Sequence, residues 1–220
     1  MRLPRVASVR ASRLRLKKQL KLQVKERVAK KKRKHRSLAE KSTKGDIDIS
    51  DIWLDDSASG KNAVLSVEVL STKDANGLSI SVSNVSNVAL QLTASDAAGL
   101  SHVALQDISG SSSQVSEISV KKSSLQSLSI SRVGFNSGGT VNVMKSKIKE
   151  HLAFVDVAKI KSLMVKDSES ARVQIQEIDS VAGDLIIEGH QLTGPRRVFD
   201  LDLEDAVIGG NVVIDNISGA

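Results

Sequence analysis

The chain has 220 residues, 40% of them hydrophobic and 26% charged, which predicts a globular domain with an appendage rather than a disordered chain. It has no cysteine, which excludes disulfides, zinc ribbons, iron–sulfur clusters and thiol nucleophiles. With no Tyr, one Trp and three Phe, the core must be built mainly from Val, Ile, Leu and Ala, a composition that suits thin, regular β layers.

The net charge of +7 is divided unevenly along the chain. Residues 1–44 carry eighteen Lys and Arg against Glu26 and Glu40, which gives +16. The remaining residues carry fourteen Lys and Arg against twenty-three Asp and Glu, which gives −9. We therefore predict a basic arm over 1–44 and a β-rich body over 45–220. An asymmetry of this size is typical of a tail that binds a polyanion.

The arm has an apolar repeat among its cations. Leu16, Leu20, Val24 and Val28 recur every four residues and would form one narrow stripe on a helix. Leucines at alternating positions, starting at Leu14, leave a strand open as a second interpretation of part of the segment. A helix this cationic repels itself, so we expect it to form only partly until its charge is neutralised.

Three kinds of partner fit the arm, and a solvated tail without a partner is the alternative. Nucleic acid offers dense phosphate, and counterion release makes such binding strong and insensitive to sequence. An anionic membrane surface suits a basic amphipathic helix, but the arm has no Trp or Phe to anchor it. An acidic protein surface, including the body of a neighbouring copy, also fits.

We expect nucleic acid to be the partner, and the stripe of Leu16, Leu20, Val24 and Val28 to dock on protein. The cations expected to neutralise phosphates are Arg13, Arg15, Lys17, Lys18, Lys21, Lys25, Arg27, Lys30, Lys31, Lys32, Arg33, Lys34 and Arg36. The basic N-terminus lacks the apolar segment of a secretory signal peptide, and no apolar run is long enough for a transmembrane helix. We therefore expect the protein in the cytoplasm or inside a particle assembled there.

The body repeats a short beat: apolar, any, apolar, any, any, apolar. Examples are "IDISDI" from Ile47, "LSISRV" from Leu128 and "VQIQEI" from Val173. Alternation places the first two apolar residues on one face of a short strand, and the third lies past a bend and points back inward. Turn-forming Gly, Ser, Asn and Asp separate the beats. The body is therefore predicted to be all-β, with about a dozen short strands.

The beats lie roughly 13 residues apart on average, and two architectures fit them. In a β-solenoid, two or three short strands make each turn and stacked turns bury columns of Val, Ile and Leu. In an antiparallel sandwich or jelly roll, the strands form two packed sheets. Scarce aromatics and Pro favour the solenoid, whereas uneven spacing favours the sandwich. We predict the solenoid.

Within residues 181–219, "GDLIIEG" and "IGGNVVID" locally resemble the coils of bactofilins, which are polymerising bacterial β-helix scaffolds. Any β-solenoid produces such a pattern, so the likeness supports the fold class alone.

One segment departs from the β rhythm. From Met144, the residues Ile148, Leu152 and Val155 have helical spacing, which predicts a short helix or wide turn that caps or interrupts the stack.

The sequence has few candidates for catalytic residues. His35, His102, His151 and His190 have no metal-ligand spacing, and His190 is expected to be a polar turn residue. The Ser residues form no nucleophile motif. Asp200, Asp202 and Glu204 alternate with apolar residues and would share one strand face, where a carbohydrate-active β-helix could use them as acid and base. The preferred interpretation of these acids is a solvated face. We expect no enzyme, no cofactor and no metal.

A basic arm followed by an all-β body is the layout of many viral coat and minor virion proteins, an analogy of architecture alone. The sequence thus predicts a structural or assembly protein of a virion or nucleoprotein particle. Its arm would dock on nucleic acid, while its body packs with other subunits as a homo-oligomer or in a larger assembly. The alternatives are a polymerising scaffold, anchored through the arm to a neighbouring subunit or an anionic membrane, and a carbohydrate-active β-helix enzyme.

Overall fold

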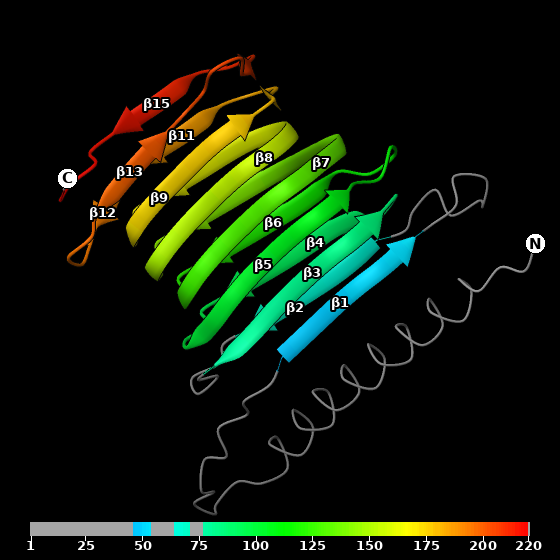
Figure 1. Ribbon diagram of the computed structural model, residues 1–220, viewed down its shortest axis with the longest axis horizontal. Coiled ribbons are helices and arrows are strands. Elements are labelled where there is room, and N and C mark those ends of the chain that lie inside the picture. Colours follow the sequence, from blue (N-terminus) through cyan, green and yellow to red (C-terminus); the bar gives the residue numbers. More distant parts are fainter. Residues whose placement is uncertain (1–45, 54–63, 71–76, 220) are drawn as a thin grey trace, which may run out of the picture.

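The computed structural model describes residues 46–53, 64–70 and 77–219. These residues are all-β, without a helix among them, and form a β-solenoid of about six turns (Figure 1). Every strand pair among them is parallel, whereas a sandwich of the predicted kind would be antiparallel. The predicted solenoid is therefore confirmed. In the same residues, no helix is long and apolar enough to span a membrane.

The strands lie in two layers, and each turn of the solenoid contributes to both (Figure 1). The first layer contains β1 (Asp46–Trp53), β3 (Leu78–Ser86), β5 (Leu100–Ser109), the first halves of β7 (Ser124–Met144) and β8 (Lys147–Lys166), β9 (Glu169–Ile178), β12 (Gln191–Leu192) and β13 (Val198–Leu201). The second layer contains β2 (Val64–Leu70), β4 (Ala89–Ser95), β6 (Ser116–Lys121), the second halves of β7 and β8, β10 (Ser180–Val181), β11 (Leu185–Glu188), β14 (Val207–Ile208) and β15 (Val212–Asp215). The long strands β7 and β8 thus run through both layers.

Between β3 and β9, successive turns of the first layer are 22 to 25 residues apart. The spacing follows from five residues that pair in sequence across the first layer: Leu78, Leu100, Leu125, Ile148 and Ser170. Each turn holds two copies of the apolar beat, one in each layer. The predicted spacing of roughly 13 residues therefore corresponds to half a turn.

The bend inside the beat is a residue in the left-handed backbone conformation. In β7, Ile130 and Val133 are both buried, and Arg132 between them has a φ of 51°. A left-handed residue interrupts the alternation of side chains, so that two residues three positions apart face the same side. Equivalent positions of the first layer have φ between 53° and 56°: Asp51, Asn84, Asp107, Asp156 and Glu177. The inward direction predicted for the third apolar residue is thereby confirmed.

The core consists of aliphatic columns that run through the stack. One column takes a buried side chain from each of five neighbouring strands: Ile80, Val103, Leu128, Leu152 and Val173. Burying one such side chain stabilises the fold by about 1.5–3 kcal/mol. Because each side chain is covered by those of the turns before and after it, the thin body needs few aromatic rings.

Buried serines occupy the corner where the second layer leads back to the first. Ser123, Ser146 and Ser168 hold the same place in successive turns, each directly after a residue with positive φ. The Ser146 hydroxyl donates to the Met144 carbonyl at 2.9 Å and accepts the Ser123 N–H at 3.3 Å. The Ser168 hydroxyl accepts the Ser146 N–H at 3.2 Å in the same way. This serine ladder links each turn to the one before it.

The helix predicted after Met144 is wrong, because residues 147–166 form strand β8. Ile148 and Leu152 are both buried in the solenoid core. The partners of Ile148 and His151 on β7 are only two residues apart, so β8 has one extra residue there. This β-bulge places Ile148 and Leu152 four positions apart on the same face, a spacing that also occurs on helices.

Candidate functional site at the C-terminal turn

The last described turn of the solenoid leaves apolar side chains uncovered. Leu185 and Ile187 of β11 are fully buried, and β15 stacks on them through Val212 and Ile214. No described strand stacks on Val212 and Ile214 in turn, so these side chains are 46% and 41% exposed. Val207 of β14 is 70% exposed. The turn therefore presents residues of the core pattern to the outside.

The exposed apolar surface continues onto the outer side of the second layer. Val213 is 36% exposed and pairs with Ile186, which pairs with Met164. In earlier turns the same row is polar: Thr93, Ser119 and Asn142. We call Val207, Val212, Val213 and Ile214 the C-terminal patch. Contiguous apolar surface of this kind marks sites of protein interaction, whereas the terminal turns of soluble solenoids are usually polar.

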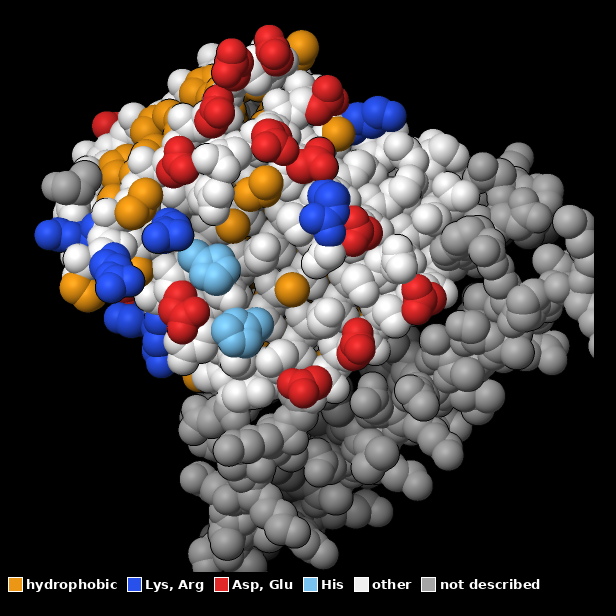
Figure 2. Space-filling model, in the orientation of Figure 1, with side chains coloured by type: hydrophobic (Ala, Val, Ile, Leu, Met, Phe, Trp, Pro, Cys, Tyr) orange, Lys and Arg blue, Asp and Glu red, His pale blue; other side chains and the backbone are white. Residues whose placement is uncertain are grey.

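Carboxylates surround this patch. Between Val198 and Gly219 the chain has five acids and no Lys or Arg, and the acids are Asp200, Asp202, Glu204, Asp205 and Asp215. Figure 2 shows acidic side chains gathered over the C-terminal end of the solenoid, with hydrophobic side chains exposed beside them. Residues 198–219 thus combine exposed apolar side chains with a charge of −5, and Arg196 and Arg197 come directly before them.

The three acids considered as a catalytic set do not share a strand face. Strand β13 ends at Leu201, so Asp200 lies in the strand, while Asp202 and Glu204 follow it. Asp200 accepts a hydrogen bond from Nε2 of Gln176 at 2.8 Å, and Asp202 accepts the backbone N–H of Glu204 at 3.0 Å. Asp200 is half-buried, whereas Asp202 and Glu204 are exposed.

The first described turn is acidic as well. Asp46, Asp48, Asp51 and Glu68 belong to β1 and β2, and no Lys or Arg lies in the described residues of these two strands. Both ends of the described solenoid therefore carry negative charge. The predicted arm residues, from Arg13 to Arg36 with the stripe of Leu16, Leu20, Val24 and Val28, lie outside the described residues.

His190 lies in the connection between β11 and β12, in line with the turn that the sequence predicted, but its side chain is completely buried. Its Nε2 atom lies 2.9 Å from Oγ of Ser170, and its Nδ1 atom has no hydrogen-bond partner. Burial lowers the pKa of His190 to about 4, since the charged imidazolium would lose its hydration, while Glu169 acts weakly in the opposite direction. His190 is therefore neutral near pH 7 and belongs to the core.

A second histidine contacts a serine on the first layer. Nδ1 of His102 lies 2.7 Å from Oγ of Ser127, and the row across the neighbouring strands continues with His151 and Arg172. A serine nucleophile needs a base that a third group orients, together with donors for the oxyanion. This row supplies no carboxylate to orient the imidazole. We therefore assign the His102–Ser127 hydrogen bond a structural role.

An ion pair joins two left-handed positions on the edge of the solenoid. Nε of Arg132 lies 2.6 Å from Oδ1 of Asp107, and a second contact of 3.0 Å makes the pair bidentate. The hydrogen bonds from Arg132 hold the pKa of Asp107 below its usual value, and those same bonds raise the pKa of Arg132. Both side chains are exposed, so the pair fixes local geometry more than it stabilises the fold.

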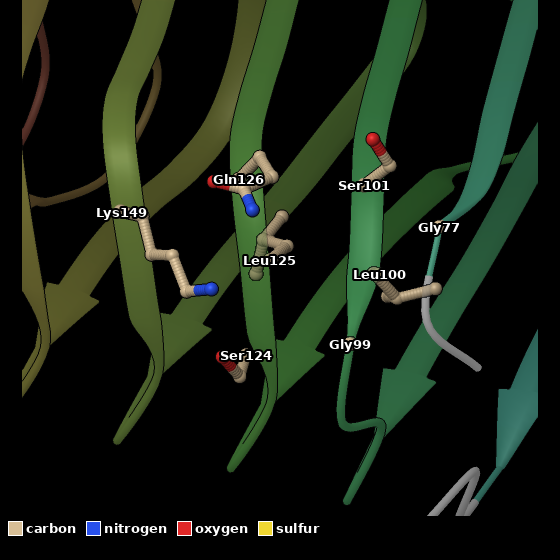
Figure 3. Close-up of a pocket in the computed structure, with 8 residues that line it drawn as sticks. All are labelled: Gly77, Gly99, Leu100, Ser101, Ser124, Leu125, Gln126 and Lys149. Atoms are coloured by element: carbon tan, nitrogen blue, oxygen red, sulfur yellow. The ribbon is translucent and has the colours of Figure 1, made fainter. Parts of the chain in front are cut away.

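Two hollows of the described surface are lined mainly by polar atoms. One of about 180 Å³ lies between β5, β7 and β8, where Gln126 and Lys149 come from neighbouring strands (Figure 3). Another of about 420 Å³ lies beside the serine ladder, and there Lys147 pairs with Glu169 at 2.8 Å. Among the residues that the structure describes, no cluster of three or more His, Asp or Glu could hold a metal ion.

The C-terminal patch could not be predicted from the beat, because Val212 and Ile214 follow the same pattern as buried residues of earlier turns. The available signal was the row of outward residues, which changes from polar in early turns to apolar at Ile186 and Val213.

No protein-family model, curated protein or solved structure matches this chain, so a function must be inferred from the surface and charge described above.

Proposed function

We propose that this protein is a non-enzymatic assembly protein of a nucleoprotein particle. Its arm binds nucleic acid without sequence specificity, and its solenoid body contacts other subunits. The observation that carries this proposal is the separation of charge: residues 1–44 have a net charge of +16, while the rest of the chain has −9. One part is built to hold a polyanion, and the other is not.

The body is unsuited to hold nucleic acid by itself. Its two ends are acidic, and two of its lysines are already neutralised by carboxylates. Nζ of Lys147 lies 2.8 Å from Glu169, and Nζ of Lys166 lies 2.8 Å from Glu188. Non-specific binding of nucleic acid scales with the number of phosphates that free cations neutralise. The arm must therefore provide most of these contacts.

Salt dependence of binding tests the proposal on the full chain. The logarithm of the association constant for duplex DNA should fall linearly with the logarithm of salt concentration, by about 0.9 for each neutralised phosphate. Substituting Lys31, Lys32 and Lys34 by Gln should reduce that slope by about 2.7.

The matched control substitutes three exposed lysines of the body, Lys121, Lys149 and Lys161, by Gln. The control has the same net charge as the arm variant but should retain almost the whole slope. Equal slopes for the two variants, or a wild-type chain that does not bind DNA at about 0.05 M salt, would contradict the nucleic-acid function.

The C-terminal patch favours a second candidate, a polymerising scaffold that assembles without nucleic acid. Val207, Val212 and Ile214 offer apolar contact area that a soluble monomer would normally bury. In that case the arm would hold the body to a neighbouring subunit or to an anionic membrane. Large assemblies of nucleic-acid-free protein that persist after nuclease treatment would favour this candidate over the first.

A further inference from the structure

We infer that the apolar stripe of the arm, formed by Leu16, Leu20, Val24 and Val28, lies as a helix across the N-terminal end of the solenoid and caps it within the same chain. The basic run of residues 30–36 follows the stripe and stays free to bind nucleic acid, a statement that rests on the proposed function. The arm is thereby divided into a capping segment and a binding segment.

Two core columns of the second layer connect the first described turn to the last. One begins at Val67 and ends at Val212, and the other begins at Val69 and ends at Ile214. At the C-terminal end no described strand stacks on Val212 and Ile214, and they are 46% and 41% exposed. At the N-terminal end no described strand stacks on Val67 and Val69 either, yet they are only 6% and 5% exposed.

The rest of the first turn is buried to the same degree. Ile49 of β1 is 3% exposed and Leu65 of β2 is 6% exposed, although β1 pairs only with β3 and β2 only with β4 among the described strands. A terminal turn of a solenoid needs a cap that shields its core. The cover of these side chains therefore has to come from a part of the chain outside the described residues.

The composition of the sequence identifies the arm as that part. Residues 54–63 and 71–76 contain Leu54 as their one Leu, Ile, Val, Met or Phe, which is too little to cover four inward side chains. The arm contains the stripe, whose four residues recur every four positions and so form one side of a helix. The stripe is therefore the segment that matches the apolar end of the solenoid.

The dimensions of one helix suit this end. Facing β layers lie about 10 Å apart, and a helix with its side chains is about 10–12 Å wide, so one helix closes the gap between the layers. Strand β1 has eight residues and is about 26 Å long, whereas a helix from Leu16 to Val28 is about 20 Å long. Such a helix also covers the open edges of β1 and β2, which would otherwise pair with other chains.

The charges of the two parts are complementary. The exposed acids around the end are Asp46, Asp48, Asp51 and Glu68. On the arm, Lys17, Lys21 and Lys25 each follow a stripe residue directly, so their ammonium groups would reach the rim while their stems pack beside the stripe. The acids thereby supply the neutralisation that this cationic helix needs in order to form. The acidic end of a second solenoid would instead bring carboxylates against carboxylates, which opposes association.

The chain connecting the stripe to the body is long enough for docking within one chain. Seventeen residues separate Val28 from Asp46, and they span at most about 60 Å when extended. The C-terminal turn lies six strand steps from β1, or about 29 Å at about 4.8 Å per step, so the arm can reach both ends of the body. A preference for the N-terminal end would therefore report a real contact rather than the limit of the tether.

The absence of cysteine from the chain allows a test by cross-linking. A full-length chain with Gln23→Cys and Ser66→Cys is treated with a short bis-maleimide in dilute solution. Gln23 precedes Val24 of the stripe, and Ser66 is exposed on β2. The matched control carries Gln23→Cys and Ser218→Cys, because Ser218 is exposed at the opposite end. The cross-link within the chain should form in about tenfold higher yield at Ser66, because docking raises the effective concentration of the arm there.

Two outcomes of this experiment would contradict the inference. Equal yields at the two serine positions, or a higher yield at Ser218, would overturn the cap. A covalent dimer as the main product of the Ser66 chain in dilute solution would assign the cap to a second copy and overturn the contact within one chain.

Matched leucines of the arm separate a helical cap from a stranded one. Leu16→Gln with Leu20→Gln removes two residues of the stripe. Leu14→Gln with Leu22→Gln removes two leucines that lie away from the stripe on a helix. All four positions are even, so on a strand they would share one side and the two variants would behave alike.

Hydrogen exchange and circular dichroism of the full-length variants give the readout. Exchange at the paired amides of β1 and β2 should become about a hundredfold faster in the stripe variant and change little in the control, because only the first uncovers the terminal turn. The helical circular dichroism should fall in the stripe variant alone, since the described residues contain no helix. Equal effects of the two variants, or a wild-type chain without a helical signal, would overturn the helical cap.

The acids of the capped end have their own variant. Asp46→Asn, Asp48→Asn and Glu68→Gln remove three exposed carboxylates there, and Asp51 is kept because it accepts a hydrogen bond from Asn84 at 3.0 Å. The control removes three exposed carboxylates at the other end, with Asp202→Asn, Glu204→Gln and Asp205→Asn. The Ser66 cross-link at low salt should fall severalfold in the first variant and persist in the control. Equal falls would overturn the role of the N-terminal acids.

DNA binding by the wild-type chain separates the cap from the proposed function. If the chain cross-links at Ser66 but does not bind DNA, the cap stands and the nucleic-acid function of residues 30–36 falls. If the chain binds DNA but does not cross-link at Ser66, the cap falls and the proposed function stands.

Discussion

Nε2 of His190 lies 2.9 Å from Oγ of Ser170. His190 is a large residue in a column of small ones, and Ser170 is a small residue in the neighbouring column of large ones. The corner column has serine at Ser123, Ser146 and Ser168 and then histidine at His190. The adjacent strand column has Leu125 and Ile148, then Ser170, and then Leu192. The small Ser170 thus leaves the space that the buried imidazole fills.

This exchange predicts strong coupling between the two positions. Ser170→Ile alone should destabilise the fold by about 1–3 kcal/mol, because the larger side chain would overlap the imidazole. His190→Ser alone should cost about 2–3 kcal/mol, because it leaves a cavity. The double variant restores the arrangement of the preceding turns, a corner serine beside an aliphatic strand residue. Its loss of unfolding free energy should therefore be at least about 1 kcal/mol smaller than the summed losses of the two single variants. Urea denaturation of the four proteins measures this coupling, and strict additivity would contradict the exchange.

The low pKa of His190 predicts that stability depends on pH. The unfolded chain binds a proton at His190 below its ordinary pKa of 6.5, whereas the folded protein does so only near pH 4. The contribution of neutral His190 is therefore fully present above about pH 6.5 and declines as the pH falls toward 4, by up to about 3 kcal/mol. Carboxylates titrate in part of this range, so the measurement is the difference from the Ser170→Ile, His190→Ser double variant. Parallel pH profiles of the two proteins would contradict the assignment.

The serine ladder should contribute measurably to stability. The hydroxyl of Ser146 donates to Met144 and accepts from the N–H of Ser123, and Ser146 and Ser123 are both buried. Ser146→Ala would leave the buried N–H of Ser123 without its acceptor and should lower the unfolding free energy by about 1–3 kcal/mol, while the Met144 carbonyl keeps the Lys122 N–H as a donor at 2.9 Å. Ser129→Ala, on the outward side of β7, serves as the control and should change it by less than about 0.5 kcal/mol. Equal effects in thermal or urea unfolding would show that the ladder contributes nothing specific.

The repeating beat was sufficient to predict an all-β body, but it fitted a solenoid and a sandwich alike, and the choice of the solenoid rested on the scarcity of aromatic residues and Pro. The third apolar residue, such as Val133, was placed correctly since its inward direction follows from the pattern alone. The cause of this inward direction, however, could not be predicted from the sequence. Arg132 has a positive φ, and nothing in the identity of an arginine indicates a left-handed backbone. Local propensity is overridden here by the stacking of turns.

The errors have a common physical origin in contacts between turns. The four-residue spacing of Ile148 and Leu152 arises from a β-bulge, and only pairing with β7 distinguishes it from a helix. The burial of His190 within its turn could not be predicted, because it depends on Ser170, twenty positions earlier. The exposure of Val207 depends on the lack of a described strand above it, which no local pattern reports.

The left-handed residue at Lys145 offers a stabilising substitution. Lys145 has a φ of 50°, a conformation that costs an L-residue with a side chain about 1–2 kcal/mol and glycine almost nothing. The equivalent position of a later turn is already glycine, at Gly189 with a φ of 63°. Lys145→Gly keeps the backbone hydrogen bond from residue 145 to the Lys166 carbonyl, which is 2.9 Å long. Glycine also makes the unfolded chain more flexible, which offsets part of this advantage. The free energy of unfolding should therefore rise by about 0.5–1 kcal/mol.

The matched control is Lys149→Gly, which removes an exposed lysine from the interior of β8, where the φ is not positive. Glycine weakens a strand at such a position, so this variant should lose about 0.5–1 kcal/mol. The two lysines have the same charge and both are exposed, so opposite shifts in the melting temperature isolate the backbone conformation as the cause. A loss of stability in both variants would show that the left-handed turn at Lys145 does not exist in solution.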